Sequence, residues 1–446
     1  MSYDPLKAAI HATAEKGDIG TLRTFVRNEH PADLADFVVD LPPDSVWTVL
    51  DLLNLRDQAR LFAALPHADQ VRLARTAPRA KLAEFVSAMP ADRRADLWND
   101  LNEHEREALL PALAQAARED VRRLAGYRPG TAGAIMTSDY AVLTADLDAS
   151  DALQKLRQEA PEKETIYRSF VIDEDRRLIG SVHLQDLIIS PPGTRVTDVM
   201  RRKTFAMPVD ADQEEVARCV ARYDLLALPI VDGKNRLVGI VTHDDAMDVL
   251  QEEATEDIHR FGGSGEIRNI RTAGIYLLYR ARIFWLLLLV FANIFAGAGI
   301  AYFEETIEAY VALVFFLPLL IDSGGNAGSQ SATLMVRSLS TGDVHLGDWS
   351  WIIGREVAVA ALIGVSMAVA VSFLGILRGG LEVAVVVSLS MVLIVMVGSL
   401  IGILLPFLLT RFNIDPATAS APLVTSVADA VGVVIYFAIA TAFLIP

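Results

Sequence analysis

Residues 283–302 read IFWLLLLVFANIFAGAGIAY, twenty consecutive positions without a charged side chain. At a rise of about 1.5 Å per residue, a helix of this length spans about 30 Å, the thickness of the hydrocarbon layer of a membrane. Four further stretches are long and apolar enough for the same role: Ala309–Met335, Val357–Leu377, Val383–Thr410 and Ser420–Ile445. The sequence therefore predicts an α-helical polytopic membrane domain with five spans, within residues 276–446.

Charged residues predict the orientation of these spans and the kind of partner. Arginines flank one side, and these are Arg280, Arg282, Arg337, Arg355 and Arg411. Only Arg378 falls on the other side, so the N-terminus is expected in the cytosol and the C-terminus outside, in the cell inner (cytoplasmic) membrane. The N-terminal residues lack the apolar stretch of a signal peptide, in agreement with this orientation. A net charge of −16 argues against a nucleic-acid partner and favours cations.

Two aspartates interrupt otherwise apolar spans. Asp429 has uncharged residues on both sides within the fifth span, and Asp322 precedes the run Gly324–Gln330, which also contains Asn326. An ionisable residue within a span is costly and by default marks a site or a pathway. We expect the helix to loosen at the glycines, next to protein or water, although close helix packing through small residues is the alternative. Oxygen ligands in two spans indicate a pathway for a hard cation.

The first 128 residues are predicted to form an all-α superhelical domain. Leu41-Pro42, Leu65-Pro66 and Met89-Pro90 recur every 24 residues, and each proline precedes an amphipathic run. Proline is tolerated at the start of a helix, so the period indicates stacked helix pairs. The charges of this domain are interpreted as a solvated face, and none is selected as a site.

A second repeat follows, with a period of 59 residues. Arg177–Asp186 and Arg236–Asp245 match at five of ten positions, and each copy reads as strand, helix, strand, acidic turn, strand, helix. Met136 and Met200 near the start of each copy make the pair resemble tandem CBS domains of α/β fold, with units at 134–195 and 196–250. Such pairs usually act as regulatory modules.

An acidic connecting helix is predicted to begin at Asp244, and the connecting segment and its joint cover residues 251–275. Its carboxylates lie three or four residues apart and repel one another unless a cation lies among them. A solvated acidic helix is the simpler interpretation of the spacing alone. Gly262-Gly263-Ser264-Gly265 then forms a flexible joint to the first span.

The order of these parts resembles the MgtE family of magnesium channels and transporters. Three motifs resemble those of this family. They are Glu253–Ile258, Pro318 followed by Gly324–Leu334, and Asp415-Pro416 followed by Pro422–Asp429. The family implies a homodimer in the lipid bilayer, with a pore lined by the second and fifth spans. It also implies that Mg²⁺ is both the transported ion and the ligand that closes the pore when cytosolic Mg²⁺ is high, with other divalent cations as possible substrates.

The metal-binding candidates follow from the spans and from this resemblance. In the membrane domain they are Asp429, which matches the family's pore carboxylate, Asp322, Asn326 and Asp415. In the cytosolic part they are Asp212, Glu214, Asp224, Asp245, Asp248, Glu253, Glu256 and Asp257. Ser329, Ala421 and Asp322 depart from the family pattern, which affects the expected selectivity among divalent cations. Departures at Arg168, Gln185 and Leu225 do not favour ATP as a ligand of the CBS pair.

Three other functions compete with transport of Mg²⁺. An intramembrane aspartyl protease also has two aspartates in two spans, but its Tyr-Asp and Gly-x-Gly-Asp motifs are absent, so an enzyme is not expected. A CBS-regulated anion transporter would favour Arg or Lys in the pathway, and no such residue lies inside a span. A magnesium sensor without conduction remains open, and ion flux into liposomes would separate it from a channel.

Overall fold

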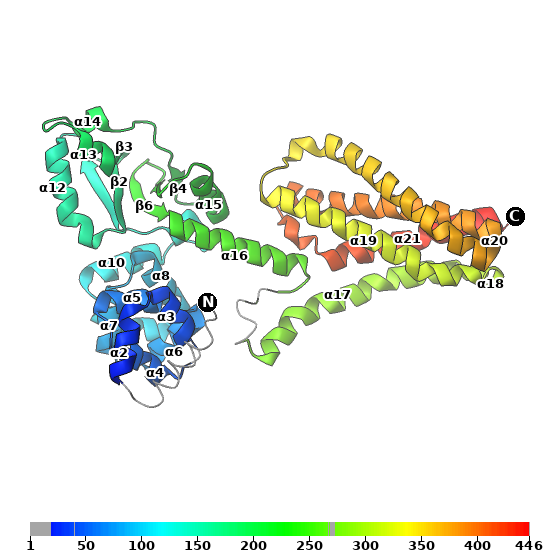
Figure 1. The fold of residues 1–446 in the computed structure, drawn as a ribbon, viewed down its shortest axis with the longest axis horizontal. Coiled ribbons are helices and arrows are strands. Elements are labelled where there is room, and N and C mark those ends of the chain that lie inside the picture. Colours follow the sequence, from blue (N-terminus) through cyan, green and yellow to red (C-terminus); the bar gives the residue numbers. More distant parts are fainter. Residues whose placement is uncertain (1–18, 40, 266, 268–272, 446) are drawn as a thin grey trace. The chain divides into compact units, whose positions relative to one another are not determined.

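The computed structural model describes residues 19–39, 41–265, 267 and 273–445. Residues 1–18 of the predicted helical domain and 268–272 of the predicted joint therefore lie outside the described residues. The chain divides into two units, at residues 1–251 and 252–446. Each unit is treated by itself below (Figure 1).

Short helices of seven to ten residues form the first part of unit 1. They are α2 (Ile19–Asn28), α3 (Pro31–Val38), α4 (Pro43–Leu50), α5 (Leu55–Ala63), α6 (His67–Thr76), α7 (Arg79–Ser87), α8 (Ala91–Asp100), α9 (Glu103–Leu109) and α10 (Gln115–Leu124), with a 3₁₀ turn, η1 (Leu110–Ala112), before the last. Pro42, Pro66 and Pro90 stand immediately before α4, α6 and α8. Each helix from α2 to α8 contacts the helix two places further along. The prediction that this part is all-α is thus confirmed for the described residues, and the contacts agree with the stacking that the repeat indicates.

Two similar three-stranded sheets follow. The first unit has β1 (Tyr140–Thr144), β2 (Thr165–Ile172) and β3 (Leu178–His183), with α11 (Ala132–Ile135), α12 (Ala149–Glu159), η2 (Ala160–Glu162) and α13 (Leu184–Ile189). The second has β4 (Met207–Pro208), β5 (Ala227–Val231) and β6 (Leu237–Thr242), with α14 (Val196–Val199), α15 (Gln213–Arg222) and α16 (His243–Phe261). In both sheets the first two strands are parallel and the last two antiparallel.

Reciprocal contacts relate the two copies at the predicted spacing. Leu178 donates its N–H to the carbonyl of Asn235, and Leu237 donates to that of Arg176, each at 3.0 Å. Met200 packs on Gly180 and Met136 on Gly239, where an added Cβ would clash with the methionine sulfur. The 59-residue repeat therefore folds as a pair of like units, as the sequence predicts.

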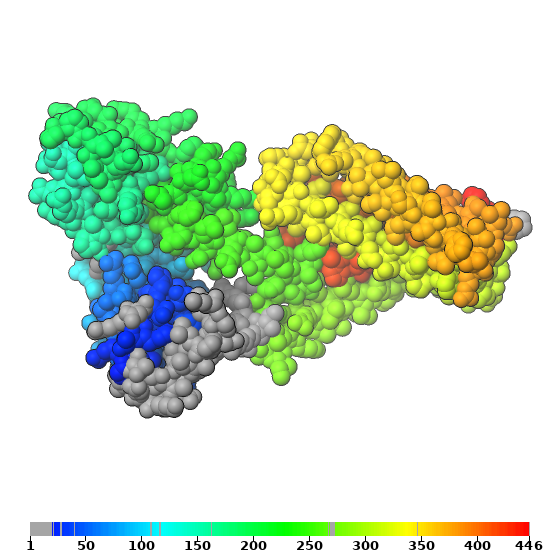
Figure 2. All heavy atoms as spheres, viewed as in Figure 1, coloured from blue at the N-terminus to red at the C-terminus, as the bar shows by residue number. Residues whose placement is uncertain are grey.

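Unit 2 is built from long apolar helices. They are α17 (Ile275–Tyr302), α19 (Ala312–Ser340), α20 (Trp349–Arg411) and α21 (Ala421–Leu444), with the short elements α18 (Glu304–Ala309), η3 (Leu346–Asp348) and η4 (Pro416–Thr418) between them. Among the described residues these four helices have the length and composition to cross a membrane. In the face shown in Figure 2, α21 (red) is visible only in small areas between the other helices, in keeping with its many buried side chains.

The 63-residue helix α20 is two antiparallel halves. Gly380 between them has φ 80° and ψ −175°, a conformation that only glycine adopts readily. Gly375 lies against Ala384, and Gly364 lies against Val392, so the halves return along each other. The turn occurs where the sequence separates the predicted spans Val357–Leu377 and Val383–Thr410.

The expected loosening of α19 at its glycines is wrong. The helix continues without a break from Ala312 to Ser340. Its glycines instead allow close approach to α20: a Cβ added to Gly398 would lie 2.3 Å from the carbonyl oxygen of Gly324, and one added to Gly402 would lie 2.1 Å from that of Gly328. The run of small residues therefore serves helix packing, the alternative interpretation of the sequence.

Candidate functional site

A cavity of about 430 Å³ opens between α19 and α21 in unit 2. Its polar lining is Asp322, Thr425 and Asp429, and its apolar lining is Leu317, Pro318, Ile321 and Gly325. The two aspartates that the sequence selected within different spans are thus brought to one cavity. Carboxylate oxygens are the ligands that Mg²⁺ and Ca²⁺ prefer.

Gly325 allows the Asp429 carboxylate to approach α19. A Cβ at Gly325 would lie 3.1 Å from Asp429 Oδ1 and 3.3 Å from the Thr425 methyl group. A side chain there would therefore press on the carboxylate and narrow the cavity. Pro422 stands in the first turn of α21, and the Ser420 hydroxyl accepts a hydrogen bond from the backbone N–H of Leu423, which fixes the start of this helix.

Asn326 holds the second carboxylate. Its Nδ2 donates to Asp322 Oδ2 at 3.0 Å, one helical turn away. Both side chains are exposed on the surface of the single chain. The other oxygen of Asp322 has no protein donor recorded among the described residues and is available to a water molecule or an ion.

Asp415 caps a turn and forms an ion pair. Its Oδ1 accepts a hydrogen bond from the backbone N–H of Ala417 at 2.8 Å, and its other oxygen pairs with Arg260 at the end of α16. Arg260 also pairs with Glu256. Next to them, burial raises the pKa of Asp257, which is hydrogen-bonded to Ser340, and the charge of Asp415 adds to this rise. Within unit 2 the predicted residues Glu256, Asp257 and Asp415 therefore surround one arginine.

In unit 1, Asp245 and Asp248 converge on a residue of the helical domain. Arg93 of α8 lies 2.6 Å from Asp248 Oδ2 and 3.7 Å from Asp245 Oδ1. The neighbour of Arg93, Asp92, is only 7% exposed. Burial, followed by repulsion from neighbouring carboxylates, raises the pKa of both Asp92 and Asp245 to about 7. We call Asp92, Asp245, Asp248 and Glu164, with Arg93, the acidic cluster.

The hydrogen bond from Thr242 lowers the pKa of Asp245, against the larger rise that burial and repulsion from Asp92 cause. The Thr242 hydroxyl lies 2.5 Å from Asp244 Oδ1 and 2.6 Å from Asp245 Oδ2. A hydroxyl has one proton and can donate to only one of two carboxylates. The hydroxyl of Thr242 therefore lies between two neighbouring carboxylates and can satisfy one of them at a time. Glu164 lies close to the same charges, and desolvation and repulsion from Asp245 and Asp244 raise its pKa as well.

Sequence reasoning missed the contribution of the helical domain to this cluster. Asp92 and Arg93 lie in an amphipathic run after Met89-Pro90 and were interpreted as part of a solvated face. The adjacent Ala91 and Ala95 are almost fully buried against the second CBS unit, in the same core as Val216 and Ala246. The alanines beside these charges were the only signal in the sequence that the first turn of α8 is buried against another domain.

The remaining predicted metal residues have local roles. Asp212 caps α15 by accepting hydrogen bonds from the N–H groups of Glu214 and Glu215, and the Glu214 carboxylate pairs with Arg218 at 2.9 Å. Asp224 is exposed with φ 48°, and Glu253 is partly exposed on α16. Across the described ranges no group of three or more His, Cys, Asp or Glu side chains is close enough to hold a bare metal ion.

The positions that argued against ATP are partly closed in the structure. Arg168 is 8% exposed, and it donates hydrogen bonds to the carbonyl of Ala227 and to the hydroxyl of Ser181, each at 3.3 Å. Leu225 is buried in the core of the second CBS unit, whereas Gln185 is exposed. Arg168 thus fills space within the CBS pair.

Comparison with known families matches three parts of the chain. A model described as a divalent cation transporter, MgtE, matches residues 317–439. The MgtE intracellular N domain matches residues 29–130, and the CBS domain matches residues 132–191 and 196–252.

Full-length relatives are similar over almost the whole chain. The magnesium transporter MgtE of Thermus thermophilus is 36% identical over 445 residues, which cover 98% of each chain. That of Bacillus subtilis is 33% identical over 445 residues, covering 100% of this chain and 98% of its own.

Two solved structures resemble the soluble part. The soluble part of a magnesium transporter has a TM-score of 0.53 and 27% identity, and covers 57% of this chain and 100% of its own. The cytosolic domain of the Mg²⁺ channel MgtE in complex with ATP has a TM-score of 0.52 and 35% identity, and covers 55% of this chain and 99% of its own.

Proposed function

The chain belongs to the MgtE family of divalent cation transporters, and from that premise we propose that its membrane part conducts Mg²⁺ and that Mg²⁺ bound to its cytosolic domains closes the pore. The family consists of transporters and not of enzymes. The observation that carries the proposal is the cavity where Asp322 of α19 and Asp429 of α21 meet.

We propose five membrane crossings, with the two halves of α20 as separate spans. The turn at Gly380 supports this count, because a continuous 63-residue helix would be about three times as long as a bilayer is thick. With every flanking arginine except Arg378 on the cytosolic side, the C-terminus is proposed to lie outside. The predicted domain limits, at 128, 134–195, 196–250, 251–275 and 276, belong to the same proposal.

The pore is proposed to form between two copies of the chain. Asp322 and Asn326 are exposed on α19 of the single subunit, directly after the long apolar run that begins this helix. A carboxylate exposed in the membrane needs water or protein around it. A homodimer whose axis passes these residues would supply both and would double the number of oxygen ligands.

Mg²⁺ gives up its water reluctantly, so a pore should hold it through its hydration shell. Two carboxylates in a wide cavity, rather than a tight cage of three or more, suit a hydrated ion. Asp429, which lies beside Gly325 and Thr425 in the cavity, is proposed as the main ion site. Asp322 and Asn326 are proposed to orient the hydration water. Because these contacts are indirect, other divalent cations are expected to compete.

Closure is proposed to follow from cations bound among the cytosolic carboxylates. Asp92 and Asp245 belong to different domains, and their ionised forms repel each other across the contact of α8 with α16. A divalent cation in the acidic cluster would stabilise that contact. The free energy that it contributes equals the difference between its binding free energies for the compact and the open states. Glu253, Glu256, Asp257 and Asp415, near the end of α16, and Asp212, Glu214 and Asp224, in the second CBS unit, are proposed as further weak sites.

ATP is not proposed as the controlling ligand, although the relative of known structure was solved with it. The buried Arg168 side chain fills part of the CBS pair in this chain. A binding measurement with ATP and the full chain tests this, and micromolar affinity would contradict it.

Reconstitution into liposomes tests the proposed function. The purified chain should admit Mg²⁺ to vesicles that enclose a Mg²⁺-sensitive dye, and empty vesicles provide the control. A folded protein that binds Mg²⁺ but gives no flux above the empty vesicles would favour the alternative of a sensor without conduction.

A further inference from the structure

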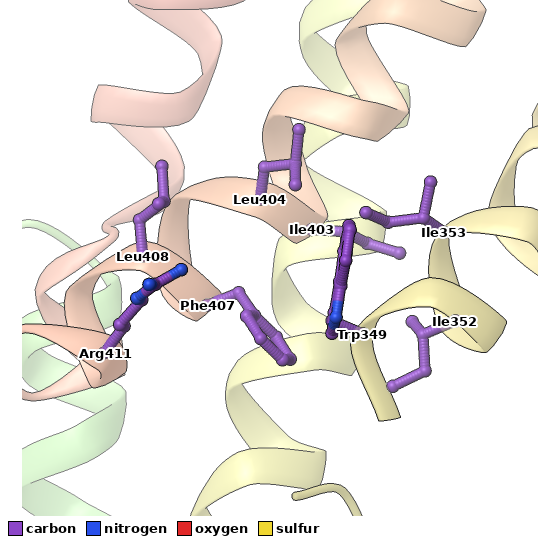
Figure 3. A pocket seen from close by; sticks show the side chains of 8 residues that line it. All are labelled: Trp349, Ile352, Ile353, Ile403, Leu404, Phe407, Leu408 and Arg411. Carbon is purple, nitrogen blue, oxygen red and sulfur yellow. The ribbon is translucent and has the colours of Figure 1, made fainter. Parts of the chain in front are cut away.

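An apolar groove of about 420 Å³ lies between the two ends of α20, far along the helix from its turn at Gly380. The first turns of α20 contribute Trp349, Ile352 and Ile353. The last turns contribute Ile403, Leu404, Phe407, Leu408 and Arg411. Figure 3 shows Trp349 and Ile353 facing the helix that carries Leu404 and Phe407, with Arg411 at the side of Phe407.

The groove exists because the two halves of α20 diverge. A Cβ added to Gly364 would lie 3.0 Å from the Cα of Val392, so the halves are in contact there. About three turns nearer the helix ends, Ile352 and Leu404 both line the open groove. Leu404 is 38% exposed and Leu408 is 48% exposed, so this surface is not covered by the chain itself.

At the mouth of the groove stands a positive charge for which the described residues supply no carboxylate partner. Among the described residues no carboxylate lies within ion-pair distance of Arg411, and its side chain is exposed. Arg355, at the same end of α20, also has no carboxylate partner there, and its guanidinium stacks 5.5 Å from the ring of Trp351. Trp349 and Trp351 are two of the five tryptophans of the chain, and tryptophan concentrates where the headgroups of a membrane begin.

We propose that this groove binds one anionic phospholipid of the leaflet that the arginine-rich ends of the helices face. Its phosphate pairs with Arg411, and an acyl chain lies along Ile352, Leu404 and Phe407. Guanidinium groups bind phosphate through paired hydrogen bonds, and basic pockets between membrane helices on the cytosolic side bind anionic headgroups. The volume falls within the range of about 300–1,000 Å³ that is common for ligand pockets. The proposal requires α20 to lie in a membrane, but it does not require that the chain conducts Mg²⁺.

Native mass spectrometry of the full chain, released from detergent with added lipid, tests the site. Phosphatidylglycerol and phosphatidylcholine with identical acyl chains are compared, together with inorganic phosphate alone. We expect one phosphatidylglycerol to be retained per protomer, with weaker retention of phosphatidylcholine and none of phosphate. Arg411→Gln should weaken retention of phosphatidylglycerol about tenfold or more, the effect of losing the charge-assisted hydrogen bonds of the guanidinium.

Two further variants keep the test decisive. Arg378→Gln removes an arginine at the other end of the first half of α20 and should leave retention unchanged. Leu404→Trp fills the groove with an apolar side chain and should expel both lipids, even where Arg411→Gln fails to fold. Equal retention of the two lipids, retention unaffected by Arg411→Gln, equal loss in Arg378→Gln, or binding of phosphate alone would each overturn the proposal. Lipid retained in Leu404→Trp together with a changed oligomeric state would show that the groove is a contact between copies, and would also overturn it.

Discussion

Asp245→Asn tests the proposed cation site in the acidic cluster. The side chain of Asp245 is 14% exposed, and that of Asp92 is 9% exposed. Raising a carboxyl pKa from 3.8 to about 7 means that ionising it in the folded chain costs about 4 kcal/mol more than in water. Because the mutual repulsion contributes to both groups, the cost for the pair is less than twice this value. Asparagine keeps the shape and removes one of the two charges.

The sign of the pH dependence follows from proton binding. Between pH 3.8 and about 7 the folded chain binds more protons at Asp92 and Asp245 than the unfolded chain does. Stability of the contact between α8 and α16 therefore falls as pH rises through this window. A divalent cation would replace the lost protons and restore the contact above pH 7.

Limited proteolysis of the full chain in detergent measures the opening of this contact. Without Mg²⁺, the unmutated chain should be cleaved faster at pH 8 than at pH 5, and added Mg²⁺ should slow cleavage at pH 8. In Asp245→Asn the dependence of cleavage on pH and its dependence on Mg²⁺ should both become smaller. The change in the free energy of opening should be up to about 4 kcal/mol. Asp175→Asn, on an exposed turn of the first CBS unit, is the matched control and should behave as the unmutated chain. Cleavage that does not accelerate between pH 5 and pH 8, or an undiminished Mg²⁺ effect in Asp245→Asn, would refute the reasoning.

Three further predictions concern the membrane domain and α16. Gly398→Ala should lower the thermal unfolding midpoint, because its Cβ would meet the Gly324 carbonyl oxygen at 2.3 Å, at a cost of about 1–3 kcal/mol or more; Gly297→Ala, with open space around it, should leave the midpoint nearly unchanged, and equal effects would contradict the packing argument. Asp322→Asn should reduce Mg²⁺ flux less than Asp429→Asn does and should change the ratio of Mg²⁺ to Ca²⁺ flux, and an unchanged ratio would remove Asp322 from the pathway. Flux should lose its inhibition by Mg²⁺ on the cytosolic side when amides replace four carboxylates of α16, and retained inhibition would assign closure elsewhere; the four are Asp248, Glu253, Glu256 and Asp257.

Repeats and apolar runs were the parts of the fold that the sequence could predict. Leu41-Pro42 and its two recurrences located the stacked helices, and the 59-residue repeat located both CBS units. These signals are periodic, so they survive without knowledge of tertiary contacts. The turn at Gly380 also fell between two predicted spans, because two charged residues, Arg378 and Glu382, and two glycines interrupt the apolar pattern there.

Glycines and charges were harder to interpret, because their meaning depends on a partner surface. Gly324 and Gly328 indicated a loosened helix, whereas they allow the backbone of α19 to approach that of α20. A glycine in a sequence is compatible both with a flexible backbone and with close helix packing, and the sequence does not distinguish the two. Asp92 was missed for a related reason: a charge beside alanines is solvated or buried according to what covers it, and the covering helix lies some 150 residues further along the chain.

The presence of Asp322 and Asp429 in one cavity was predictable only in part. Each aspartate was recognised because its neighbours in the sequence are apolar, but their shared cavity depends on Gly325, whose missing side chain makes room for the Asp429 carboxylate. The sequence showed this glycine without showing which helix it faces.

Flux of Mg²⁺ into liposomes by the Asp429→Asn variant tests the central claim most directly. Asp343→Asn, a carboxylate on an exposed turn outside the cavity, is the matched control. Both proteins are reconstituted at equal density after their thermal unfolding midpoints show that they are folded. We predict that Asp343→Asn retains the flux of the unmutated chain and that Asp429→Asn falls to the level of empty vesicles. Flux through Asp429→Asn equal to that of Asp343→Asn would contradict the assignment of the cavity as the ion pathway.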